Sequence, residues 1–170
     1  MVNMRPFTAF EQRNLKFLIN HNVKFTQVEI TPTGLGKGIL DATAPMRAYF
    51  LENDIHNYGE QPQGQEYKQI KTASILTEST EFITKASFYR PNTKKGDPRM
   101  WIYGFGSYTV GNDIHVLFWF EKTLYSINIT RIDIEKCYNS AIITPMQEVL
   151  KAISIAGNSV SDELLGRFRS

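Results

Sequence analysis

The sequence predicts a mainly β member of the α+β class, in which an antiparallel sheet or barrel is flanked by helices. In the middle of the chain, apolar and polar residues alternate with the period of strands, whereas apolar residues recur at helical spacing near both ends. The regular alternation of strands and helices that marks a doubly wound fold is missing. The length of 170 residues favours one domain, with a core that needs no disulfide or metal.

Four elements are expected in the first third of the chain: a helix, a strand, a loop and a second helix. Thr8 and Glu11 have the spacing of a capping box, which predicts the start of the first helix. Three glycines and a proline close together predict the loop. Thr43 and Pro45 predict the start of the second helix. In order, these elements are expected at residues 8–20, 23–30, 31–38 and from 43 onward.

A long polar loop is expected at residues 53–65, and the period of the sequence then changes to that of strands. The expected strands are residues 67–76, 81–89, 100–105, 114–120 and 124–129. The strand at 114–120 is apolar on both faces, with His115 as a packed core residue, so it should be central and covered. The short connection at residues 121–123 predicts a hairpin between the last two strands.

The C-terminal part of the sequence returns to helical spacing. Thr144 and Gln147 predict the start of a helix, which Gly157 should end, and a further short helix is expected at residues 161–168. The single domain is therefore expected to contain an N-terminal helix (1–22), a barrel (23–130) and C-terminal helices (131–170).

The composition excludes several classes of protein. Aromatic residues make up 12% of the chain, too many for a disordered protein, and the single Cys137 excludes an internal disulfide framework. The sequence has neither an apolar run long enough to span a membrane nor the apolar start of a signal peptide, which predicts a cytoplasmic location. The histidines are scattered, so no metal site is expected. Lys37 is followed by Gly38 rather than Ser or Thr, so the glycine-rich loop does not match a phosphate-binding motif.

The net charge is only +2, but basic residues gather between the second and third expected strands of the sheet region. Arg90 and Arg99 could hydrogen-bond guanine edges or phosphates, and Asn92 could read adenine. Asp97 could accept from cytosine, while Lys94 and Lys95 suit phosphates. A hairpin with these side chains would fit the major groove of double-stranded DNA. The plainer interpretation is a solvated hairpin tip.

An alternative function is that of a small magnesium-dependent nuclease. Glu66 and Lys68 would share one face of a strand if the strand began there, and Asp41 or Asp54 would supply a second carboxylate. A surface salt bridge is the plainer interpretation of this pair. A second alternative is an interaction module for a partner other than DNA, with the basic hairpin as its docking surface.

Three segments of the chain carry a resemblance to a known family. They are TPTGLGKGILDAT at residues 31–43, GQEYK at 64–68 and YRPNTKKGDPRMW at 89–101. The chain resembles, over residues 23–129, the N-terminal DNA-recognition domain of restriction endonucleases of the MvaI/BcnI type with a UbaLAI-like architecture. That domain is similar to the effector-binding domain of EcoRII and to the plant B-three domain, an antiparallel pseudobarrel.

The resemblance implies that two arms grip the major groove of a short site of the CCWGG type. The expected contacts are Thr33, Lys37, Arg90, Asn92, Lys94, Lys95, Asp97, Arg99 and Trp101. It also implies that the domain holds no cofactor and that catalysis, with Mg²⁺, belongs to a nuclease domain further along the same chain. The 170 residues would then be one domain of a longer type II restriction endonuclease.

Overall fold

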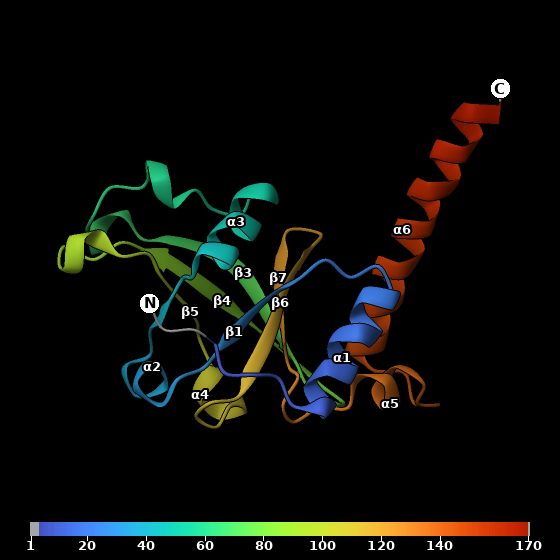
Figure 1. Ribbon diagram of the computed structural model, residues 1–170, viewed down its shortest axis with the longest axis horizontal. Helices are drawn as coiled ribbons and strands as arrows, with labels where there is room; N and C mark the ends of the chain where they lie inside the picture. The colour runs from blue at the N-terminus through green and yellow to red at the C-terminus, as the bar shows by residue number, and fades with distance from the viewer. Residues whose placement is uncertain (1–3, 170) are drawn as a thin grey trace.

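The computed structural model describes the backbone of residues 4–169 and the side chains of residues 4–157. One curled sheet of seven strands forms its centre, with helices packed around it (Figure 1). The strands are β1 Thr26–Glu29, β2 Leu40–Asp41, β3 Gln69–Leu76, β4 Glu81–Tyr89, β5 Arg99–Ile102, β6 Ile114–Phe120 and β7 Thr123–Asn128. The helices are α1 Ala9–Asn20, α2 Pro32–Lys37, α3 Ala44–Glu52, α4 Phe105–Tyr108, α5 Ile134–Tyr138 and α6 Pro145–Arg169. Three short 3₁₀ turns span Tyr58–Glu60, Gln65–Tyr67 and Lys94–Gly96.

The strand order β1-β6-β7-β3-β4-β5-β2 confirms the α+β class and makes the sheet mixed. All neighbouring strands are antiparallel except β3 and β7, which run parallel. The expectation of a purely antiparallel sheet is therefore wrong at one pair. The chain makes three more strands between β3 and β7, and so long a connection allows it to return in the same direction.

The sheet curls because a short connection joins its two edge strands. Residues 30–39 link β1 to β2, and the six residues of α2 lie within this link. Such a link reaches at most about 22 Å, whereas a flat sheet of this size would separate its edges by about 29 Å. The edges must therefore approach one another, and the sheet becomes a half-barrel.

Strand β6 is buried on both faces, as the sequence predicts, and lies inside the sheet between β7 and the edge strand β1. Val116 and Phe118 face a core formed with α1, α5 and α6, whereas Leu117 faces the core inside the curled sheet beneath α3. His115 is fully buried between Ser126 and Thr109, which hydrogen-bond its two ring nitrogens at 2.7 and 2.8 Å. The predicted hairpin of β6 and β7 is also present, with Glu121 and Lys122 at positive φ.

The helix that begins at Pro145 does not end at Gly157 but continues to Arg169, so the predicted stop and the predicted second helix at residues 161–168 are wrong. A glycine costs a helix only about 1 kcal/mol relative to alanine, which packing can offset. A Cβ at Gly157 would lie 3.2 Å from the Cβ of Asn22, so the glycine allows α6 to pass close to the end of α1. Its C-terminal turns extend away from the sheet (Figure 1).

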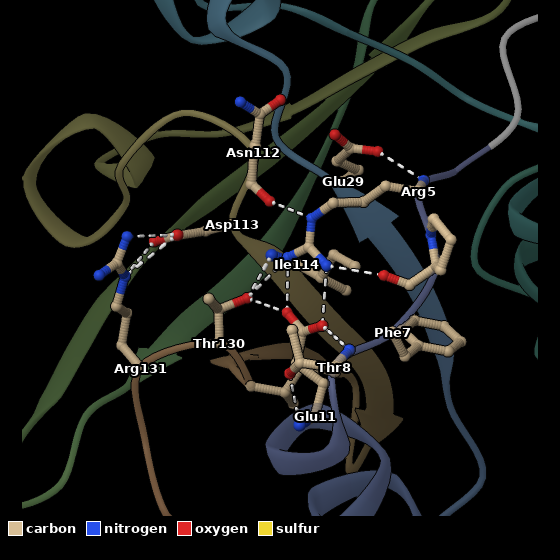
Figure 2. A network of polar contacts seen from close by, with 12 residues as sticks. Arg5, Phe7, Thr8, Glu11, Glu29, Asn112, Asp113, Ile114, Thr130 and Arg131 are labelled. Atoms are coloured by element: carbon tan, nitrogen blue, oxygen red, sulfur yellow. Dashed lines mark hydrogen bonds and ion pairs between the residues drawn. The ribbon is translucent and has the colours of Figure 1, made fainter.

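A polar network fixes the segment before α1 to the sheet (Figure 2). The fully buried Glu11 carboxylate accepts hydrogen bonds from the Arg5 guanidinium at 2.6 and 2.8 Å, from the Thr130 hydroxyl and from the Thr8 amide. The Thr8 hydroxyl accepts from the Glu11 amide in return, which completes the predicted capping box. Arg5 also donates its backbone N–H to Glu29 of β1. The start of α1, the edge of the sheet and the turn after β7 are thus joined around one carboxylate.

No helix in the described part of the chain combines the length and apolar character needed to cross a membrane.

Candidate nucleic-acid interface

The first arm, residues 31–38, is a short helix rather than the predicted loop. Thr31 accepts a hydrogen bond from the Gly34 amide at 3.0 Å as N-cap, Pro32 occupies the first turn and Gly38 ends the helix at a φ of 67°. Helices often have proline in the first turn and glycine just past the end. Pro32 and Gly38 fit this pattern, so the sequence contained a signal for the short helix. The helix fixes the backbone from which the exposed side chains of Thr33 and Lys37 extend.

The second arm, expected at residues 90–101, consists of the connection between β4 and β5 at residues 90–98 and the first residues of β5. Lys94, Lys95 and Gly96 have successive φ values of 50°, 58° and 72°. Two lysines in the left-handed region cost conformational energy, and such strain often accompanies a functional site. Both lysine side chains are exposed, as are those of Asn92 and Asp97.

The polar loop at residues 53–65 is largely irregular, as predicted. It is hydrogen-bonded to the second arm. Arg90 donates from Nε to the Gly96 carbonyl at 2.9 Å and from Nη1 to the Gln61 carbonyl at 3.0 Å. The Gly64 amide donates to the Arg90 carbonyl at 2.7 Å. The guanidinium of Arg90 therefore positions the arm, with two of its donors engaged by backbone.

Both arms line one cleft of about 460 Å³. Thr33 and Lys37 come from the first arm, and Lys94 and Asp97 from the second. The cleft is also lined by Arg99 and Asp41, cross-strand neighbours in β5 and β2 that form an ion pair. The Asp41 side chain is 75% exposed and that of Arg99 only 12%, so the carboxylate is the more accessible member of the pair.

The cleft is balanced in charge, since Lys37, Lys94 and Arg99 face the carboxylates of Glu29, Asp41 and Asp97. It therefore offers both hydrogen-bond donors and acceptors. Base edges in the major groove also present both, whereas phosphates present acceptors alone. The balance thus suits the reading of bases better than the binding of a bare phosphate.

The remaining predicted contacts lie outside this cleft. Trp101 is half-buried on β5, where its ring packs edge-on against Phe105 at 5.2 Å between centroids. A Cβ at Gly38 would lie 3.9 Å from the Trp101 ring, so this side chain supports the end of the first arm. Asn92 is exposed on the second arm, and Lys95 lines a neighbouring hollow that shares Asp97 with the cleft.

The structure does not bring together the residues of the alternative nuclease site. Glu66 lies in the 3₁₀ turn Gln65–Tyr67, and β3 begins only at Gln69, so the prediction that Glu66 and Lys68 share a strand face is wrong. The Lys68 ammonium lies 5.1 Å from the centroid of the Tyr89 ring. Asp41 is paired with Arg99, and Asp54 lines another hollow beside His56. Residues 4–157 contain no group of three or more His, Cys, Asp or Glu side chains placed to hold a metal ion.

Sequence reasoning missed the residues that hold the arms in place. Tyr58 donates its hydroxyl hydrogen to the Arg99 carbonyl at 2.7 Å, and burial raises its pKa far above the ordinary value. The buried Gln61 amide donates to the Tyr67 and Phe88 carbonyls, at 2.9 Å each. Both residues lie in the polar loop, where no periodic pattern distinguishes a buried side chain from an exposed one.

Comparisons with protein-family models, with curated proteins and with solved structures found no match for this chain.

For the DNA binding that the sequence predicts, Arg90→Lys is expected to weaken binding to all duplexes alike rather than to relax preference at one base pair. Lysine keeps the charge but cannot donate to the Gly96 and Gln61 carbonyls with the planar geometry of the guanidinium. Gel-shift titrations against duplexes that differ at each base pair measure this effect. A change of preference confined to one base pair would instead show that Arg90 reads that base.

Proposed function

We propose that this chain is a sequence-specific double-stranded DNA-binding domain that reads a short site through its two arms. The observation that carries the proposal is the shared cleft: two segments far apart in the sequence present Thr33, Lys37, Lys94 and Asp97 to one space. The proposed fold family is the pseudobarrel of B-three-like recognition domains. The curled sheet, whose edges are joined by the first arm, supports this assignment.

The chemistry of the cleft favours direct readout of bases. Lysine and arginine donate to the O6 and N7 atoms of guanine, and a carboxylate accepts from the N4 amino group of cytosine. The arms carry these groups on short segments whose backbones are held by hydrogen bonds, so little loop entropy is lost on binding. The proposed site is of the CCWGG type, and the proposed parent is a type II restriction endonuclease whose magnesium-dependent catalysis lies in another domain.

The test is a gel-shift titration with a short duplex that carries CCWGG and with a scrambled duplex, each with and without magnesium. The expected result is a preference for the site of about a thousandfold or more, without cleavage. Lys37→Ala and Lys94→Ala should each weaken the preferred complex, because both side chains line the cleft. Lys16→Ala, on the exposed face of α1, is the matched control and should bind as the wild type does.

Equal, weak binding to both duplexes would contradict sequence-specific recognition and leave only a basic surface. Binding to neither duplex would contradict a DNA-binding function. If the wild type cleaves DNA in magnesium and Lys68→Ala does not, the nuclease alternative is established instead.

A further inference from the structure

A second hollow, here called the basic groove, lies beside the second arm and has a volume of about 570 Å³. It is lined by Arg47 of α3, by the polar loop around Tyr58 and by Arg90 and Lys95 of the second arm. Lys94 lines the cleft, whereas Lys95 lines the basic groove. The left-handed turn at these two lysines thus directs neighbouring cations into different spaces.

The charge of the basic groove differs from that of the cleft. Arg47, Arg90 and Lys95 face a single carboxylate, Asp97. His56 also lines the groove; its burial and the nearby Lys71 charge lower its pKa, and the hydrogen bond that it donates to Gln61 Oε1 opposes this shift. The imidazole is therefore neutral at pH 7, and cations outnumber carboxylates in the groove three to one.

The two arginines of the groove are held in place by backbone carbonyls. Arg47 donates from Nη1 to the Ala42 carbonyl at 2.7 Å, and Arg90 donates to Gly96 and Gln61 as described. Ala42 in turn donates its backbone N–H to Pro98 of the second arm. A guanidinium has five N–H donors, so each arginine keeps donors for a ligand while its position is already fixed.

We propose that the basic groove binds a backbone phosphate of the same DNA duplex whose bases the cleft reads, with Arg47 and Lys95 as its principal cations. This inference rests on the proposed function. Within the second arm, Lys94 would then contact the bases and Lys95 a phosphate beside them, while Asp97 lies between the two hollows and lines both. It also adds Arg47, from a helix outside both arms, to the DNA-binding surface.

The test measures how the affinity for DNA depends on salt in Lys95→Gln and Arg47→Gln. Neutralising one phosphate contact should reduce the slope of log K against log salt by about 1, with base preference unchanged. Between 50 and 200 mM salt, the wild type should therefore lose about fourfold more affinity than either variant. Lys16→Gln is the matched control, and thermal melting by circular dichroism checks that each variant is folded.

A second measurement locates the phosphate. In a series of duplexes, one phosphate at a time is replaced by a neutral methylphosphonate. At one position the replacement should weaken binding of the wild type and should have no further effect on Lys95→Gln. Because Lys95 is exposed, its substitution by glutamine should leave the fold intact even if Arg47→Gln proves unstable.

One result would overturn the inference and leave the proposed function standing. The wild type would bind DNA, and the folded variants Lys95→Gln and Arg47→Gln would show the same salt slope as the wild type. In a second such result, millimolar inorganic phosphate would stabilise the wild type but not Lys95→Gln, while the salt slopes for DNA would stay unchanged. That result would show a site for free phosphate and would also overturn the inference. Failure of the wild type to bind any duplex would instead contradict the proposed function itself.

Discussion

Glu11→Ala is expected to lower the free energy of unfolding by about 2–4 kcal/mol, because it removes charge-assisted hydrogen bonds to the half-buried Arg5 together with part of a helix cap. The Glu11 side chain is fully buried and accepts hydrogen bonds from Arg5, Thr130 and Thr8 (Figure 2). Its removal leaves the Arg5 guanidinium without its partner and deletes half of the capping box of α1. Urea unfolding at pH 7 measures the loss, and Glu148→Ala, in the exposed first turn of α6, is the control.

The same carboxylate should make the protein sensitive to acid. The hydrogen bond from Arg5 holds the pKa of Glu11 at about 2, although burial opposes this shift. The unfolded chain therefore binds a proton below about pH 4.5 that the folded protein does not, and about 3 kcal/mol of stability is lost as the pH falls toward 2. Glu11→Gln should flatten this part of the stability curve.

His115 should also make the protein less stable in acid, and its effect should begin at a higher pH than that of Glu11. Burial lowers its pKa from 6.5 to about 3, so the unfolded chain gains a proton below pH 6.5 while the folded imidazole stays neutral. Stability should begin to fall below pH 6.5 and continue to fall toward pH 3. A stability that stays constant from pH 7 to pH 4 would show that the folded protein accommodates a charged His115.

Local signals in the sequence predicted most of the fold. The predicted strands at residues 81–89 and 114–120 coincide with β4 and β6, and the capping box of α1 is formed. These features depend on periodicity and on contacts between residues three or four apart. The curl of the sheet and the parallel pair of β3 and β7 depend on which distant strands meet, and no local pattern encodes that.

The candidate site was predictable in its residue types but not in its geometry. The sequence places Lys94 and Lys95 side by side, yet left-handed φ values direct them into different hollows. Arg90 has the chemistry of a base-reading residue, but two of its donors bind carbonyls of the arm and of the polar loop. The charge of a side chain and its number of donors follow from the residue type. Whether those donors are free for a ligand depends on the polar loop that contacts the second arm.

Because the position of the second arm depends on the polar loop, Gln61→Ala should have a large effect on both stability and the proposed DNA binding. The Gln61 side chain is buried, its amide nitrogen donates to the Tyr67 and Phe88 carbonyls, and its Oε1 accepts from His56 Nε2 at 2.8 Å. Alanine would leave two carbonyls without these donors, at a cost of about 1–3 kcal/mol each. We therefore expect the free energy of unfolding to fall by about 2–6 kcal/mol, measured by urea unfolding.

The same substitution should weaken DNA binding even under conditions where the variant is fully folded. Gln61 also accepts the Nη1–H of Arg90 through its backbone carbonyl, so the loop that it anchors sets the position of the second arm. Gln65→Ala, an exposed position in the next 3₁₀ turn, is the matched control for both measurements. A Gln61→Ala protein that is destabilised yet binds DNA as the wild type does would show that the arm keeps its position without the loop. The strain at Lys94 and Lys95 would then have to be held by β4 and β5 alone.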